Sequence, residues 1–131
     1  MILADTSAWV ELDRATGSPV HLRLRRALEQ DEALATVGIV ILELLAGVRE
    51  ETNIRELQRL LARCHFVPLE EPSDWEAAAA LYRACRRGGE TVRRAEDCLI
   101  AAVAIRANAE LLHRDADFDV IARHAPLVVA S

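Results

Sequence analysis

Short apolar runs alternate along this chain with longer stretches in which apolar residues recur every three or four positions. The short runs are typical of buried strands, and the longer period is typical of amphipathic helices. Their alternation predicts an α/β fold with a parallel central sheet. The expected strands are residues 2–4, 34–37, 65–69, 111–113 and 127–129.

Helices are expected between these strands. One helix is expected to begin after Pro19. The others are expected at residues 40–48, 54–61, 73–88, 94–108 and 118–123. The helix at 73–88 opens with Ser73 and Glu76 in the spacing of a capping box. The helix at 94–108 contains the stretch CLIAAVAI, which is apolar on every side and is therefore expected to be buried on every side.

Length and composition predict one globular domain. The chain has 131 residues, of which 52% are hydrophobic and 28% charged, so it can bury a sizeable core. No apolar run approaches the roughly 18 residues of a membrane span. The first residues lack a basic segment, so we expect no signal peptide and a cytoplasmic location. The odd number and wide spacing of Cys64, Cys85 and Cys98 indicate buried thiols rather than disulfides.

The charged residues exclude several classes of enzyme. The net charge of −5 gives no general attraction to nucleic acid, although local arginine patches can still bind it. All sixteen basic residues are arginines. The chain therefore has no P-loop lysine, no Schiff-base lysine and no lysine of the kind that a receiver domain needs. A phosphohydrolase of the haloacid dehalogenase type is also disfavoured, because Ser7 stands where that class has a second Asp.

Two acids lie directly after expected strands. Asp5 follows the first strand, and Asp115 follows the fourth. Open parallel sheets place their functional sites beyond the carboxyl ends of the strands. Each acid taken alone could be a loop or helix-capping residue, but together they indicate a shared site.

Two further acids interrupt apolar helices. Glu43 lies in VGIVILELLAGV, where no nearby face offers easy access to water and the nearest arginine is Arg49. Asp97 lies in the first turn of the apolar helix at 94–108, where the helix dipole favours an anion. A buried carboxylate is costly unless it is paired or binds a metal. A pocket that combines these acids with Asp5 and Asp115 predicts a hard cation, Mg²⁺ or Mn²⁺, and hydrolysis of a phosphodiester.

The same segments resemble a known family. MILADTSAWVEL resembles the opening of PIN-domain proteins, and VGIVILELLAGVR resembles their second conserved block. RRAEDCLIAAVAIRANAELLHRDADFDVIA is similar to the third and fourth blocks of VapC-type toxins. The blocks follow in the family's order and cover nearly the whole chain. The chain is thus identified as a single PIN domain over residues 1–131.

The resemblance implies a fold, an activity and partners. The fold would be three-layered, with a parallel sheet of about five strands in the order 3-2-1-4-5. The activity would be a metal-dependent endoribonuclease toxin that cuts structured tRNA or rRNA and is neutralised by a VapB-type antitoxin. A homodimer within a toxin–antitoxin assembly is implied as well. The alternative is a non-catalytic or housekeeping PIN-domain protein in RNA processing.

Residue roles follow from the same resemblance. The catalytic metal ligands would be Asp5, Glu43, Asp97 and Asp115. Asp117, Thr6 and Ser7 would be auxiliary residues.

Several further residues are candidates because of their positions in the sequence. Five arginines near the expected site could hold RNA phosphates or form an ordinary solvated face, and they are Arg86, Arg87, Arg93, Arg94 and Arg114. Trp9 and Leu12 could contact an antitoxin, although a core tryptophan is the more ordinary interpretation. Glu96, directly before Asp97, departs from the family's usual small or hydroxylated residue, so its role stays open.

Overall fold

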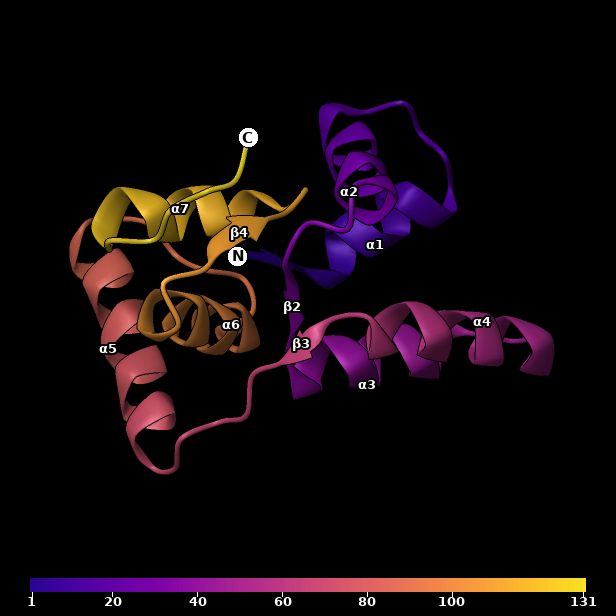
Figure 1. The fold of residues 1–131 in the computed structure, drawn as a ribbon. Helices are drawn as coiled ribbons and strands as arrows, with labels where there is room; N and C mark the ends of the chain where they lie inside the picture. The colour runs from indigo at the N-terminus through magenta and orange to yellow at the C-terminus, as the bar shows by residue number, and fades with distance from the viewer.

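A computed structural model describes residues 1–131, and its elements follow the predicted order, with one additional helix directly after the first strand (Figure 1). The strands are β1 (Ile2–Ala4), β2 (Leu34–Thr36), β3 (His65–Phe66) and β4 (Glu110–Leu112). The helices are α1 (Thr6–Asp13), α2 (Pro19–Glu29), α3 (Gly38–Gly47), α4 (Glu51–Ala62), α5 (Ser73–Arg87), α6 (Ala95–Arg106) and α7 (Ala116–His124). None of them combines the length and apolar character of a membrane span.

The four strands form one parallel sheet in the order β3-β2-β1-β4. Helices α1 and α2 pack together on one side of the sheet, and α5, α6 and α7 pack together on the other (Figure 1). The α/β class, the parallel sheet and its order are therefore as predicted. The carboxyl ends of β1 and β4 are neighbours, which brings Asp5 and the residues after β4 to the same edge of the sheet.

The expected fifth strand is a single bridge instead. Leu111 pairs with Val129 in parallel register, supported by two backbone hydrogen bonds of 2.8 Å. The terminal segment thus lies beside β4, in the fifth position, but it is too short to extend the ladder. The capping box is also absent, because Ser73 is already helical and its Oγ donates to the Glu70 carbonyl at 3.3 Å.

Helix α6 is the centre of the core. Its residues from Asp97 to Ala104 are all buried, as its apolar sequence predicts. Cys85 and Cys98 are buried free thiols, and Cys64 is partly buried and also free. Burial raises the pKa of the Cys98 thiol to about 12, so this side chain behaves as a small hydrophobic group.

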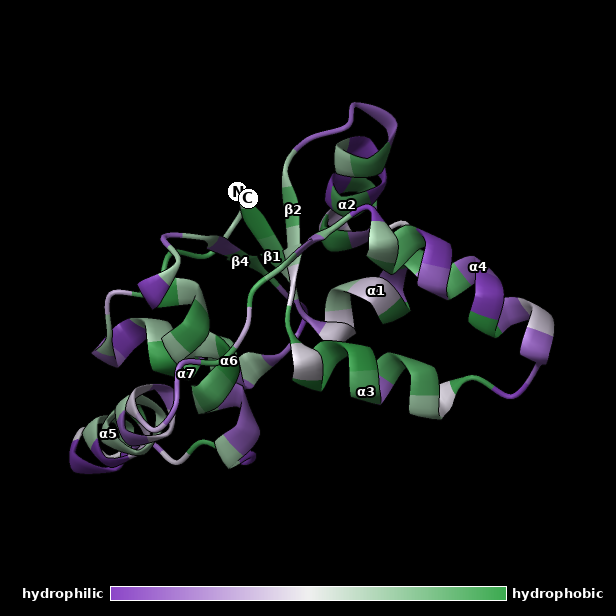
Figure 2. Ribbon diagram, turned by 60° about the horizontal axis from the view of Figure 1, so that its bottom comes forward, coloured by the Kyte–Doolittle hydropathy of each residue, from purple (hydrophilic) through white to green (hydrophobic).

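Helix α3 differs from its predicted environment. Its sequence is almost wholly apolar, yet Val40 is its only buried residue, and Leu42 is 67% exposed. Figures 1 and 2 show α3 and α4 extending away from the rest of the molecule, with apolar residues along α3. The expectation that Glu43 is cut off from water was therefore wrong, because this helix packs on one side only.

Candidate active site

Three carboxylates meet at the start of α7. Asp97, Asp115 and Asp117 each contribute one oxygen, and the three oxygens lie within 4.8 Å of one another. Asp97 and Asp117 are buried, and Asp115 is partly exposed. Three acids this close cannot all stay ionised without nearby positive charge, so the cluster favours either bound cations or protonation.

The start of α7 positions two of these acids. Asp115 is the N-cap, and its Oδ1 accepts a hydrogen bond from the Asp117 amide at 2.9 Å. The two oxygens of Asp117 accept from the backbone amides of Arg93 and Arg94, both at 3.2 Å. Burial alone would raise the pKa of Asp117, but hydrogen bonds from Asp97 and from these arginines lower it overall. Asp117 is therefore an anion that ties α7 to the segment before α6.

Asp97 lies in the first turn of α6 with only 2% of its surface exposed. Its Oδ2 is buried and has no hydrogen-bond partner. Burial raises the pKa of Asp97 to about 8, and the hydrogen bond with Asp117 and the charges of Asp115 and Asp5 act in the same direction. A buried carboxylate oxygen without a donor, next to two other carboxylates, fits the all-oxygen ligand preference of Mg²⁺ or Mn²⁺.

Asp5 adjoins this cluster from the end of β1. It is the N-cap of α1, and its Oδ2 accepts from the Ser7 amide at 3.0 Å and from the Ser7 hydroxyl at 2.6 Å. The Ser7 hydroxyl oxygen in turn accepts from the Arg114 amide at 2.9 Å. Burial raises the pKa of Asp5, the Ser7 bonds oppose that shift, and the Glu43 charge adds to it. Ser7 thus holds the Asp5 carboxylate in place and also links the start of α1 to the segment after β4.

Glu43 reaches the site from α3 and is held by two partners. Its Oε1 accepts from the Thr6 hydroxyl at 3.0 Å, and its Oε2 accepts from Arg94 Nη2 at 2.8 Å. Arg94 lies 51 residues away in sequence, which is why no local pattern revealed this pairing. Thr6 therefore orients Glu43, whereas Ser7 orients Asp5.

Two of the five candidate arginines, Arg93 and Arg94, contact acids of the site. Arg93 donates from Nε to Asp117 at 3.1 Å and from Nη2 to Asp115 at 2.7 Å. Arg94 spans Glu43 and Glu96, and Glu96 is itself 56% exposed. Arg93 and Arg94 therefore neutralise part of the acidic charge.

The side chains of the other three arginines form no hydrogen bond or ion pair with the three-acid cluster. Arg114 pairs with Glu11 at 3.3 Å, and Arg86 lies over the Tyr82 ring at 5.9 Å. Arg86 and Arg87 occupy the last turn of α5.

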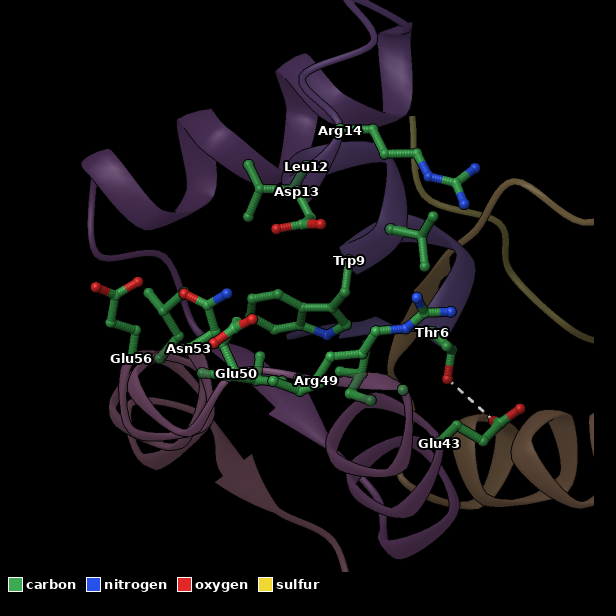
Figure 3. Close-up of a pocket in the computed structure, with 16 residues that line it drawn as sticks. Thr6, Trp9, Leu12, Asp13, Arg14, Glu43, Arg49, Glu50, Asn53 and Glu56 are labelled. Atoms are coloured by element: carbon green, nitrogen blue, oxygen red, sulfur yellow. Dashed lines mark hydrogen bonds between the residues drawn. The ribbon is translucent and has the colours of Figure 1, made fainter.

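A groove of about 470 Å³ lies beside the three-acid cluster and includes none of its residues. Thr6 and Glu43 stand at one end of it, and the Trp9 indole lies between α1 and the start of α4 (Figure 3). Trp9 is only 3% exposed and belongs to the core, while Leu12 is partly buried against that core. The ordinary interpretation of Trp9 as a core residue is therefore confirmed, although its ring also lines the groove.

A second, shallower hollow was not anticipated from the sequence. It adjoins Asp115 and includes His113 and Asp119. An acid in the first turn of a helix is so common that Asp119 carries no distinctive signal in the sequence. The available clue was a histidine directly before the Arg114–Asp115 pair.

Comparisons with known proteins agree with this geometry. The PIN domain family model matches residues 2–124. Ribonuclease VapC11 of Mycobacterium tuberculosis and VapC ribonuclease Mb1587 of Mycobacterium bovis are each 48% identical over 132 residues, covering 100% of this chain and 98% of the relative.

A solved structure shares the fold at lower identity. VapBC2 from Rickettsia felis, bound to a DNA fragment from its promoter, aligns with a TM-score of 0.75 at 21% identity. The alignment covers 99% of this chain and 98% of that one. The family match and the 48% identity over the full length of the chain establish that this protein belongs to the PIN-domain family.

Proposed function

We propose that this chain is a metal-dependent endoribonuclease toxin that cleaves structured RNA, such as tRNA or rRNA, and is neutralised by a cognate VapB-type antitoxin. The observation that carries the proposal is the cluster of Asp97, Asp115 and Asp117 with an unpartnered buried oxygen on Asp97. Relatives named as VapC ribonucleases support the reaction class.

The proposed cofactor is Mg²⁺ or Mn²⁺. Asp97 and Asp115 would hold it, with Asp5 and Glu43 at the same edge and Asp117 close enough to take part. When bound, such an ion lowers the pKa of a coordinated water and offsets charge on the phosphodiester transition state. The residues of the chain hold the acids in place: Ser7 orients Asp5, and Thr6 orients Glu43.

The arginines beside the acids would hold the RNA backbone. Arg93 and Arg94 contact carboxylates through Nε and Nη2, which leaves Nη1 of each without a protein partner. Their side chains are 68% and 48% exposed, so these remaining donors can reach phosphate oxygens. Arg114, 57% exposed, would extend the RNA-contacting surface past Asp115.

The groove beside the acids is the proposed antitoxin site, with Trp9 and Leu12 as contacts. It offers apolar surface and contains more acidic than basic side chains, so a segment that carries both leucine-like and basic residues would fit. The acids of the groove are Asp13, Glu43, Glu50 and Glu56, and its basic residues are Arg14 and Arg49. Because the groove ends at Glu43, a docked segment would also obstruct the approach of RNA. The exposed apolar surface of α3 supports the proposed homodimer.

The test is cleavage of purified tRNA and rRNA by the isolated protein. It is run with Mg²⁺ or Mn²⁺, with EDTA, and with the Asp97→Asn variant. Loss of a direct metal ligand should lower the rate by about a hundredfold or more, because even outer-shell changes cost about 10–100-fold. The matched control is Glu51→Gln, which removes one charge from the exposed start of α4.

Discrete fragments that require the metal and vanish with Asp97→Asn are the expected result. Fragments that survive EDTA and the substitution would contradict the proposed chemistry. If no RNA is cut and Mn²⁺ fails to raise the melting temperature, the non-catalytic alternative takes its place, since a ligand that binds the folded state must stabilise it.

A further inference from the structure

A hollow of about 340 Å³ lies at the start of α7 and shares Asp115 with the acidic cluster. Its lining consists of His113, Arg114, Asp115, Ala116, Asp119 and Val129. A ligand group in this hollow would therefore sit next to the phosphodiester that the proposed active site would cut.

The hollow offers both a hydrogen-bond acceptor and a donor. The Asp119 side chain is 61% exposed, and the Arg114 side chain is 57% exposed. Ala116 and Val129, the latter 39% exposed, add apolar surface. A flat group with a polar edge and an apolar face matches this combination, and nucleobases in single-stranded RNA are such groups.

His113 lies beneath Asp119 and has an unused donor. Its Nδ1 accepts a hydrogen bond from the Asp115 amide at 3.1 Å, so the ring hydrogen must be on Nε2. That Nε2 is buried without a partner, and the residue is only 8% exposed. Asp119 Oδ1 lies 3.6 Å away, just beyond hydrogen-bond distance. A small inward movement of Asp119 would satisfy the histidine and fix the carboxylate in the hollow.

The lining of the hollow suits neither simple ion well. Asp115 and Asp119 would repel a phosphate, and the Arg114 guanidinium would weaken binding of a metal cation within the hollow itself. Among the bases, guanine alone places two N–H donors, N1–H and N2–H, side by side on its Watson–Crick edge. A carboxylate accepts both at once, and the neighbouring O6 can accept from a guanidinium. Adenine and cytosine would instead turn a ring-nitrogen lone pair toward the carboxylate, and uracil would offer a single donor, N3–H, between two carbonyls.

We infer that the hollow binds a guanine base of the RNA, with Asp119 accepting from N1–H and N2–H and Arg114 donating to O6. His113 is a positioning residue that supports Asp119 from below. The inference rests on the proposed ribonuclease function and adds a specificity determinant to it. It names guanine as the preferred base beside the cleaved bond.

The experiment compares three fluorescein-labelled oligouridylates of eight nucleotides. Each carries one central guanosine, inosine or adenosine. Binding is measured by fluorescence anisotropy in EDTA, so that metal-dependent cleavage does not run. Guanosine should bind about tenfold tighter than adenosine, the discrimination expected of one bidentate contact, with inosine between them because it lacks the N2 amino group.

Asp119→Asn should bring the guanosine-to-adenosine ratio close to one, because an amide no longer offers two acceptors to N1–H and N2–H. Glu51→Gln, an equal loss of charge on α4, should leave the ratio unchanged. Equal binding of all three oligonucleotides, or a preference that persists in Asp119→Asn, would overturn the inference.

Cleavage with Mn²⁺ separates this failure from failure of the proposed function. Metal-dependent cleavage without any base preference would remove the guanine subsite and leave the ribonuclease in place. Absence of metal-dependent cleavage for these oligonucleotides and for structured RNA would remove both.

Discussion

Helices α6 and α3 are both strongly apolar, and each carries one acid of the proposed site, yet they occupy opposite environments. Eight consecutive residues of α6 are buried, from Asp97 to Ala104. In α3 only Val40 is buried, although Glu43 is flanked by apolar residues on both sides. An apolar helix sequence therefore indicates that the helix surface is favourably buried, but it does not show that the same chain buries it.

Asp97 of α6 and Glu43 of α3 differ in burial and in their hydrogen-bond partners. Asp97 is enclosed by protein, its Oδ2 has no partner, and burial raises its pKa to about 8. Glu43 is 23% exposed, and Thr6 and Arg94 satisfy its carboxylate. Asp97 thus depends on a cation or a proton, whereas Glu43 is already compensated by the chain itself.

The largest contrast in stability is expected when one side chain in each of the two helices is truncated to alanine. Ile100→Ala, at a position that is 1% exposed, should lower the free energy of unfolding by about 2–5 kcal/mol. Leu42→Ala, at a position that is 67% exposed, should change it by no more than about 0.5 kcal/mol. Urea denaturation at low protein concentration measures both. Similar costs for the two variants would show that α3 is covered in solution.

A smaller, pH-dependent effect on the free energy of unfolding is expected when Asp97 is replaced. Without metal, its raised pKa means that the folded protein keeps a proton that the unfolded chain releases above about pH 4. The stability of the wild type therefore falls as the pH rises from about 4 to about 8, whereas Asp97→Asn lacks this loss.

In EDTA the melting temperature of Asp97→Asn should match the wild type near pH 4.5 and exceed it at pH 8. The gain in unfolding free energy should be on the order of 1–3 kcal/mol, discounted for relaxation around the carboxyl group. A gain that is the same at both pH values would contradict an elevated pKa.

The smallest effect is expected at the Glu43 pair. Arg94→Gln removes an ion pair of 2.8 Å whose side chains are 48% and 23% exposed, so it should cost less than about 1 kcal/mol. The loss should shrink further in 0.5 M salt, because salt screens exposed charges. Arg25→Gln is the matched control, since Arg25 faces Glu29 at 3.7 Å on the surface of α2. A cost of several kcal/mol for Arg94→Gln would mean that Glu43 depends on its partner as a buried charge does.

Local patterns were sufficient for four of the strands, for most of the helices and for the acids at strand ends, but they missed α1 and overestimated the last strand. The apolar run before Asp5 and the one before Asp115 predicted both strands, and adjacent parallel strands then bring the two acids to one edge. Glu43 and Asp97 joined the same predicted site because each interrupts an apolar helix, and the family resemblance implies the same four acids. These conclusions need only periodicity and the rule that sites follow the carboxyl ends of strands.

Long-range pairings were beyond the sequence pattern. The Arg94–Glu43 contact and the amide bonds that draw Asp117 toward the segment before α6 depend on how α3, α6 and α7 pack. Asp117 consequently stands beside Asp97 and Asp115, closer to the centre than an auxiliary position suggested. The exposure of α3 could not be predicted either, because periodicity reports which residues are apolar and not which of them find a neighbour.

The two tryptophans give this molecule a built-in optical reporter. Trp9 lines the groove beside Glu43 with its indole nitrogen unpartnered, while Trp75 at the start of α5 is 49% exposed. After Trp75→Phe, the tryptophan fluorescence comes from Trp9 alone. A segment that docks there would change the polarity around a single indole, so occupancy could be followed by emission wavelength without a label on either partner.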